Sequence, residues 1–314
     1  MSYAFVFPGQ GAQVVGMGAA LAEAFPVARE VFEEVDEALK QRLFRLMVDG
    51  PESDLTLTEN TQPALMAVSM AVVRVLQREG GVSLARAGRY VAGHSLGEYS
   101  ALCAAGALSL TDCARLLKVR GQAMQAAVPV GEGAMAAILG LDFEAVEAVA
   151  REAAGDEICA AANDNAPGQV VVSGHAAAVE RAIALAKEKG AKRAVPLAVS
   201  APFHCPLMAP AADAMAEALA NATILPPDPP LVANVTARPT EDPAEIRDLL
   251  VRQVTGTVRW RESVEFLRDQ QVEHVVELGV GNVLSGLVRR IDKALDARSV
   301  TTPAEIEALI AELA

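Results

Sequence analysis

The chain has 314 residues, and its 27 Lys and Arg against 40 Asp and Glu give a formal net charge of −13. Hydrophobic residues make up 52% of the chain and charged residues 21%, which indicates a large buried core and excludes general disorder. The acidic balance argues against binding to nucleic acid or to an anionic membrane, because both would repel this surface. The length predicts about two domains, or one large domain that carries an insertion.

Cysteine usage and hydropathy predict the compartment. The four cysteines show no CxxC pair and no spacing typical of zinc sites, so we interpret them as reduced thiols. The first residues lack a basic segment followed by a long apolar run, and no stretch approaches the ~20 apolar residues that cross a bilayer. We therefore expect a soluble, cytoplasmic protein.

Apolar runs and helical periodicity alternate along the first 128 residues. The expected elements, in chain order, are a strand at 3–7, helices at 19–25, 27–39 and 62–77, a strand at 90–92, and helices at 98–105 and 110–126. Strands that alternate with helices in this way favour a mostly parallel sheet covered on both faces.

The next segment has a different rhythm. It predicts a strand at 134–139, a helix at 143–153, strands at 158–162 and 169–173, a helix at 176–189 and a strand at 193–199. This βαββαβ order is the ferredoxin-like pattern. We therefore expect a small ferredoxin-like subdomain at 129–199, inserted into a large α/β domain formed by 1–128 and 200–314. Strands at 231–235 and 275–278, with helices at 244–253 and 260–268, complete the large domain.

The segment Gly93-His94-Ser95-Leu96-Gly97 fits the G-x-S-x-G pattern of a nucleophile elbow. In an elbow, a sharp turn between a strand and a helix raises the serine hydroxyl above the sheet, and the glycines leave room for it. The backbone N–H of Leu96, which follows the serine, can then stabilise an oxyanion. The alternative is an ordinary turn in which Ser95 caps the helix. The apolar strand before the segment and the helical pattern after it favour the nucleophile.

A serine hydroxyl needs a base, which is usually a histidine. The chain has four histidines. Three of them are poorly placed to act as this base. The first adjoins the serine, the second lies in a turn of the inserted subdomain, and the third precedes a strand, whereas open α/β sheets build their sites at the carboxyl ends of strands. These are His94, His175 and His274, respectively. His204 follows the strand at 193–199, in a loop stiffened by two prolines, so elimination favours it over the alternative of a bystander.

Arg120 lies on the apolar stripe of the helix expected at 110–126. A buried arginine must find an anion, because an unpaired buried charge is very unfavourable. One interpretation is a structural ion pair with a nearby Asp or Glu, which the sequence alone favours. The other is a guanidinium fork that binds a substrate carboxylate.

Several motifs together resemble a known family. In chain order they are Phe7-Pro8-Gly9-Gln10-Gly11-Ala12-Gln13, Thr61-Gln62-Pro63-Ala64-Leu65, Gly93-His94-Ser95-Leu96-Gly97-Glu98-Tyr99, Arg120, residues 163–174, His204 and Glu277-Leu278-Gly279. This set resembles the malonyl-CoA:acyl-carrier-protein transacylases of fatty-acid synthesis, and the similarity extends over residues 3–291. The resemblance implies an α/β-hydrolase-like parallel-sheet domain with an inserted ferredoxin-like subdomain.

The resemblance also implies roles for single residues. Ser95 would be acylated and His204 would be its base. The oxyanion hole would consist of the backbone N–H groups of Gln10 and Leu96. Arg120 would hold the malonyl carboxylate.

Three further positions follow from the same resemblance. Gln62 matches a glutamine that lines the site. In this family a main-chain carbonyl orients the histidine, and the segment 253–260 resembles the stretch that supplies it, which points to the carbonyl near Arg259. Phe203 resembles the malonyl-selective form of its loop, where a bulky ring leaves less room for an α-methyl branch.

The predicted activity is ping-pong transfer of a malonyl group from malonyl-CoA, through malonyl-serine, to the phosphopantetheine thiol of acyl carrier protein. The resemblance implies no metal or redox cofactor, and we expect a monomer. One alternative is a serine hydrolase or thioesterase on the same elbow, which would have no use for a buried cation. Others are a malonyltransferase of polyketide synthesis and a non-catalytic module that binds carrier proteins. The intact set of serine, histidine and arginine argues against the last.

Overall fold

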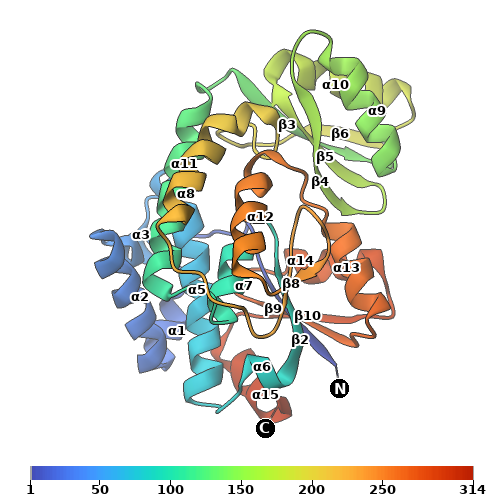
Figure 1. Cartoon of the computed structure of the whole chain (residues 1–314). Helices are drawn as coiled ribbons and strands as arrows, with labels where there is room; N and C mark the ends of the chain where they lie inside the picture. The colour runs from blue at the N-terminus through green and yellow to red at the C-terminus, as the bar shows by residue number, and fades with distance from the viewer. Residues whose placement is uncertain (1, 314) are drawn as a thin grey trace.

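Two separate β-sheets divide the structure into a larger and a smaller part (Figure 1). The computed structural model describes residues 2–313. The larger sheet has six strands in the order β10-β9-β1-β2-β7-β8. Its strands are β1 (Tyr3–Phe7), β2 (Gly88–Gly93), β7 (Leu231–Val232), β8 (Pro239–Thr240), β9 (His274–Leu278) and β10 (Asp296–Val300). All neighbouring strands run parallel except β7 and β8, so the carboxyl ends of β1 and β2 meet at one edge.

Helices cover both faces of this sheet. They are α1 (Ala19–Ala24), α2 (Pro26–Leu39), α3 (Leu43–Asp49), α4 (Glu52–Leu55), α5 (Thr58–Arg78), α6 (Leu84–Ala87), α7 (Gly97–Ala104), α8 (Leu110–Ala127), α11 (Ala209–Ala220), α12 (Pro243–Thr255), α13 (Trp260–Asp269), α14 (Val283–Ile291) and α15 (Pro303–Leu313), with a 3₁₀ turn at Pro206–Met208. The five residues of β1 are all buried, as expected for a central parallel strand.

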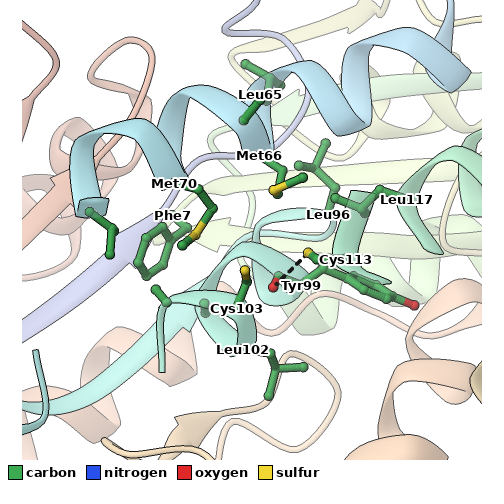
Figure 2. Packing of buried hydrophobic residues seen from close by; sticks show 14 of the residues in the cluster. Phe7, Leu65, Met66, Met70, Leu96, Tyr99, Leu102, Cys103, Cys113 and Leu117 are labelled. Atoms are coloured by element: carbon green, nitrogen blue, oxygen red, sulfur yellow. Dashed lines mark hydrogen bonds between the residues drawn. The ribbon is translucent and has the colours of Figure 1, made fainter. Parts of the chain in front are cut away.

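The alternation of side chains along β1 separates two hydrophobic clusters. Phe5 and Phe7 face the larger cluster, which includes α5, α7 and α8, whereas Ala4 and Val6 face a second one with α13 and α14. Figure 2 shows the larger cluster, in which side chains of α5 pack over α7 and Phe7. The Cys113 thiol of α8 donates to the backbone oxygen of Tyr99 at 3.4 Å within it. This packing holds the start of α7, and therefore the elbow before it, against the sheet.

The smaller part stands above the larger sheet in Figure 1. Its elements are β3 (Gly133–Leu139), α9 (Phe143–Ala154), β4 (Cys159–Ala166), β5 (Gln169–His175), α10 (Ala176–Glu188) and β6 (Arg193–Pro196). The strands form an antiparallel sheet in the order β4-β5-β3-β6, and the apolar faces of α9 and α10 pack on it. The predicted mixed α/β fold, with a parallel sheet and a separate small sheet, is confirmed at this level.

The loop between α12 and α13 joins the two parts. Val258 N donates to Ala162 O at 2.9 Å, and Asp164 N donates to Val258 O at 2.9 Å, so this loop pairs with β4. The buried Asp164 carboxylate accepts from Arg261 of α13 at 2.8 Å. Backbone pairing and a shielded ion pair together fix the smaller part over the carboxyl edge of the large sheet.

Several predicted boundaries are wrong. The strand expected at 193–199 ends at Pro196, because the chain turns there and Val199 N donates back to Leu197 O. The strand expected at 231–235 ends at Val232, where a turn toward β8 begins. The sequence analysis missed α3, α4, α6, α11, α14, α15, β8 and β10. In β10 (Asp296–Val300), polar residues interrupt the apolar run. Among residues 2–313, no helix is both long and apolar enough to span a membrane.

Candidate active site

Ser95 stands in a strained turn between β2 and α7. Its φ is 55°, in the left-handed region that non-glycine residues rarely adopt. A Cβ on Gly93 would lie 1.9 Å from the backbone of Gly97, and a Cβ on Gly97 would lie 2.2 Å from the oxygen of Phe7. Both positions therefore require glycine, which is the reason the elbow motif has this spacing.

His204 contacts this serine directly. Its Nε2 lies 2.7 Å from Ser95 Oγ, and its Nδ1 lies 2.9 Å from the backbone oxygen of Gln253. A carbonyl only accepts, so Nδ1 carries the proton and Nε2 is free to accept one from the hydroxyl. Burial, followed by the positive charge of Arg120, lowers the pKa of His204 to about 3. The imidazole is therefore neutral near pH 7.

The predicted carbonyl near Arg259 is wrong. Gln253 supplies the oxygen, and Arg259 instead donates its backbone N–H to Asn234 O at 2.9 Å. The physical reason is that α12 ends at Thr255, so the carbonyls of its last turn have no partner within the helix and can accept from a side chain.

The other histidines have partners elsewhere. His94 Nε2 lies 2.8 Å from Asn165 Oδ1. His175 Nδ1 accepts from the Ile158 backbone N–H at 2.9 Å. His274 pairs with Asp296 at 2.8 Å. Within residues 2–313, His204 is thus the histidine that contacts the serine hydroxyl.

Arg120 is a buried cation whose hydrogen-bond partners among the described residues are all neutral. Its side chain is 1% exposed on α8. Nη1 donates to Gln62 Oε1 at 2.8 Å, and Nη2 donates to Gln253 Oε1 at 2.8 Å and to Ser95 Oγ at 3.2 Å. Nε has no hydrogen-bond partner among the described residues. The ion pair that the sequence alone favoured is therefore not the arrangement found, and burial lowers the pKa of this guanidinium.

A cavity of about 270 Å³ opens above Ser95 between the two parts. The predicted site residues all line it: Gln10, Gln62, Ser95, Leu96, Arg120, Phe203 and His204. The smaller part contributes both apolar side chains, such as Met135 and Val171, and polar ones, such as Asn163, and α14 contributes Leu284 and Leu287. Both parts of the molecule therefore form the cavity wall, which combines apolar and polar side chains.

Three predicted residues take particular positions on this wall. The backbone N–H groups of Gln10 and Leu96 donate to none of the residues that the structure describes, while the Gln10 side chain contacts Thr58 Oγ1 at 3.3 Å. Phe203 is half-buried next to His204 and packs against the larger core cluster. The site thus offers a nucleophile, a neutral base, two free donors and a cation around one cavity.

Comparisons with known proteins agree with this arrangement. The model of the acyl transferase domain family matches residues 4–306. Malonyl CoA-acyl carrier protein transacylase of Salmonella typhimurium is 48% identical over 310 residues, which are 99% of each chain. The chain belongs to the malonyl-CoA:acyl-carrier-protein transacylase family. This finding confirms the resemblance recognised from the motifs and makes the protein an acyltransferase.

Solved structures of the same family extend the comparison. The acyl-carrier-protein-S-malonyltransferase of Bartonella henselae is 56% identical with a TM-score of 0.97, covering 100% of this chain and 99% of that one. A malonyl-transacylase solved in complex with a type II PKS acyl-carrier protein is 46% identical with a TM-score of 0.96, covering 99% of this chain and 100% of that one.

The sequence analysis gave no role to three buried residues around the elbow of this transacylase family member. Asn234 Oδ1 accepts from Ser95 N at 2.8 Å, and its Nδ2 donates to Gly93 O at 2.6 Å, so one amide holds the end of β2 and the backbone of the nucleophile together. Gln253 and Glu98 complete the network beneath it. A carboxylate among the apolar residues that open α7 was the signal that could have identified Glu98. No equivalent pattern marks Asn234 or Gln253.

A metal site needs several ligand side chains close together. Among the described residues, no group of three or more His, Cys, Asp or Glu side chains is placed to hold an ion.

Proposed function

We propose that this chain transfers a malonyl group from malonyl-CoA to the phosphopantetheine thiol of an acyl carrier protein in fatty-acid synthesis. The observation that carries the proposal is the pair formed by Ser95 Oγ and Arg120, whose Nη2 lies 3.2 Å away. A permanent cation beside a nucleophile, with no carboxylate among its described hydrogen-bond partners, suits an acyl group that brings its own carboxylate. Family membership also supports malonyl-CoA as the substrate, since the similar chain of Salmonella typhimurium is named malonyl CoA-acyl carrier protein transacylase.

The first half-reaction loads the serine. His204 Nε2 takes the hydroxyl proton of Ser95 while Oγ attacks the thioester carbonyl. The backbone N–H groups of Gln10 and Leu96 stabilise the oxyanion of the tetrahedral intermediate. The C–S bond then breaks, and His204 gives the proton to the departing thiolate of coenzyme A. The product is malonyl-Ser95.

The second half-reaction reverses these roles. The phosphopantetheine thiol enters the space that coenzyme A has left, loses its proton to His204 and attacks the malonyl ester. Ser95 leaves as the alcohol after taking the proton back. The neutral form of His204, held by burial, makes it competent as a base at the start of each half-reaction.

Selectivity rests on the walls of the cavity. Arg120 holds the malonyl carboxylate, and Gln62, which accepts from its Nη1, keeps the guanidinium aligned. Phe203 limits the space for an α-methyl branch, so malonyl is preferred over methylmalonyl. No metal or redox cofactor takes part in these steps.

We also propose the finer description of the architecture. The βαββαβ order and the strand order β4-β5-β3-β6 support a ferredoxin-like subdomain at 129–199. Segments 1–128 and 200–314 then form an α/β-hydrolase-like domain that carries the nucleophile elbow. The monomeric state and the cytoplasmic location expected from the sequence stay predictions.

A specific observation weighs against a hydrolase or thioesterase on this elbow. A site for neutral esters gains nothing from a cation that lies 3.2 Å from the nucleophile, where a substrate carboxylate could bind it. A non-catalytic carrier-binding module has no use for the 2.7 Å contact between Ser95 and His204. A carrier of polyketide synthesis is the alternative partner, since a similar transacylase was solved with one.

Intact-protein mass spectrometry tests the function. Mixing the protein with malonyl-CoA should add one malonyl group, which Ser95→Ala should not acquire. Adding holo acyl carrier protein should remove the group from the enzyme and place it on the carrier. If the enzyme loses the malonyl group to water without carrier as fast as it does with carrier, the protein is a hydrolase. Carriers of fatty-acid and polyketide synthesis, compared side by side, distinguish the two pathways.

A further inference from the structure

A buried carboxyl group lies beneath the nucleophile and takes no part in the steps above. Glu98, near the start of α7, is 1% exposed. Its Oε2 accepts from Gln253 Nε2 at 2.7 Å and from the Asn234 backbone N–H at 3.2 Å. Burial raises the pKa of Glu98 to about 7, although these two donors and the charge of Arg120 act in the opposite direction. The ionised form of a carboxyl group this deeply buried is stable only when a charge of opposite sign lies near it.

The Gln253 carboxamide connects this carboxyl group to Arg120. Its Nε2 donates to Glu98 and, at 2.9 Å, to the backbone oxygen of Ser95, while its Oε1 accepts from Arg120 Nη2 at 2.8 Å. A flipped carboxamide would place its oxygen against two other oxygens and its NH₂ against the guanidinium N–H. Glu98 therefore helps to fix which end of the amide faces Arg120.

Arg120 is the cation available to balance this carboxylate. Within residues 2–313, the ionisable groups whose charges act on Glu98 are Arg120 of α8 and Tyr99 of α7. Burial raises the pKa of Tyr99, so its phenol is neutral. The groups that reach Glu98 from α12 and from the turn after β7 are the neutral amides of Gln253 and Asn234.

We propose that Glu98 is the counter-ion of Arg120, acts on it through the Gln253 carboxamide as a positioning residue, and takes up a proton from solvent when a malonyl carboxylate binds. The inference rests on the proposed function, because it needs a substrate anion at Arg120. In the empty site one cation faces one anion. A bound malonyl group brings a second carboxylate to the same cation, and two carboxylates that share a site favour protonation of one.

The sign of the pH effect follows from this competition. Ionised Glu98 opposes the incoming malonyl carboxylate and protonated Glu98 does not, so malonyl-CoA binds more tightly as the pH falls through the ionisation of Glu98. By linkage, binding of malonyl raises the pKa of Glu98, and the coupling free energy is the same as the one by which protonation of Glu98 strengthens malonyl binding. An acyl group without a carboxylate, such as acetyl, has no such coupling.

Calorimetry on Ser95→Ala, which binds but cannot be acylated, tests the proposal. Malonyl-CoA and acetyl-CoA are titrated from about pH 6 to about pH 8.5, in two buffers of different ionisation enthalpy. Malonyl-CoA should lose about tenfold in affinity relative to acetyl-CoA across this range, with net proton uptake, as a coupling of ordinary size gives. Acetyl-CoA is the matched control, because it carries the same titrating phosphate groups.

The variant Ser95→Ala/Glu98→Gln identifies the proton acceptor. Gln keeps an oxygen that accepts from Gln253 and Asn234 but cannot ionise, so the malonyl-specific proton uptake and pH dependence should both disappear. If both persist in this variant, Glu98 is not the acceptor and the proposal is overturned.

Infrared difference spectra on Ser95→Ala avoid any folding defect that Glu98→Gln introduces. Malonyl-CoA should produce the C=O stretch of a protonated carboxylic acid, and ¹³C labelling of the glutamates should shift it. If malonyl-CoA binds more tightly than acetyl-CoA but this band is absent, the proposed role of Glu98 is overturned, while the malonyl site at Arg120 is not. Equal binding of malonyl-CoA and acetyl-CoA at every pH overturns the proposed malonyl site and this inference with it.

Discussion

Replacing Arg120 separates a substrate-binding cation from a structural one. Arg120→Ala removes a guanidinium that donates to Gln62, Gln253 and Ser95. Hydrogen bonds to a charged group contribute about 1.5–3 kcal/mol, so losing the contact to the malonyl carboxylate should reduce malonyl transfer by about 10- to 150-fold. Acetyl transfer should stay near the wild-type rate, because Ser95 and His204 keep their 2.7 Å contact.

The assay is the ratio of malonyl to acetyl transfer, measured together with a melting curve. Gln62 lines the cavity, so its freed oxygen can accept from water, whereas Gln253 is fully buried. Water that enters the space left by the guanidinium can reach the Gln253 oxygen, so the melting temperature should fall by only a few degrees. Arg120→Lys is the matched control: it keeps the charge but loses the fork, and should give an intermediate ratio. An unchanged ratio in Arg120→Ala, with a large loss of melting temperature and of both activities, would refute the reasoning.

Three further predictions concern the elbow and its base. Ser95→Ala should abolish the covalent malonyl adduct in the mass spectrum while keeping the fold, and a surviving adduct would identify another nucleophile. His204→Ala should lower transfer by about 10²–10⁴-fold in a stopped-flow assay; because the pKa of His204 is lowered to about 3, wild-type acylation should persist well below pH 6.5, where an ordinary histidine would be protonated. Gly97→Ala should destabilise the protein by about 1–3 kcal/mol or more in denaturant titrations, since its Cβ meets Phe7 O at 2.2 Å, whereas Gly286→Ala, with open space around its Cβ, should be neutral or stabilising.

The sequence predicted what depends on local pattern. The elbow was predictable because Gly93 and Gly97 are required by backbone crowding that recurs wherever a strand turns sharply into a helix. Arg120 stood out because a charge on an apolar stripe is rare. The family assignment needed only the order of these motifs along the chain.

The rest depends on contacts distant in sequence. Asn234 lies 139 residues from Ser95, and nothing near it in the chain indicates that its amide would clamp the elbow. Glu98 is next to the motif, but its meaning comes from Gln253, which is 155 residues away. The histidine's partner was placed at Arg259 rather than Gln253, because a free carbonyl is defined by where a helix ends and has no side chain to mark it.

The main-chain oxygen that receives His204 Nδ1 has a consequence for how this site responds to substitution. Every amino acid at position 253 carries the same carbonyl, so a mutational scan leaves the acceptor in place and reports only on the carboxamide. The group that orients the base is thus invisible to side-chain replacement. Its role can be tested only by changing the polypeptide backbone. An ester in place of the amide bond that follows residue 253 would weaken the carbonyl as an acceptor and leave the side chain intact.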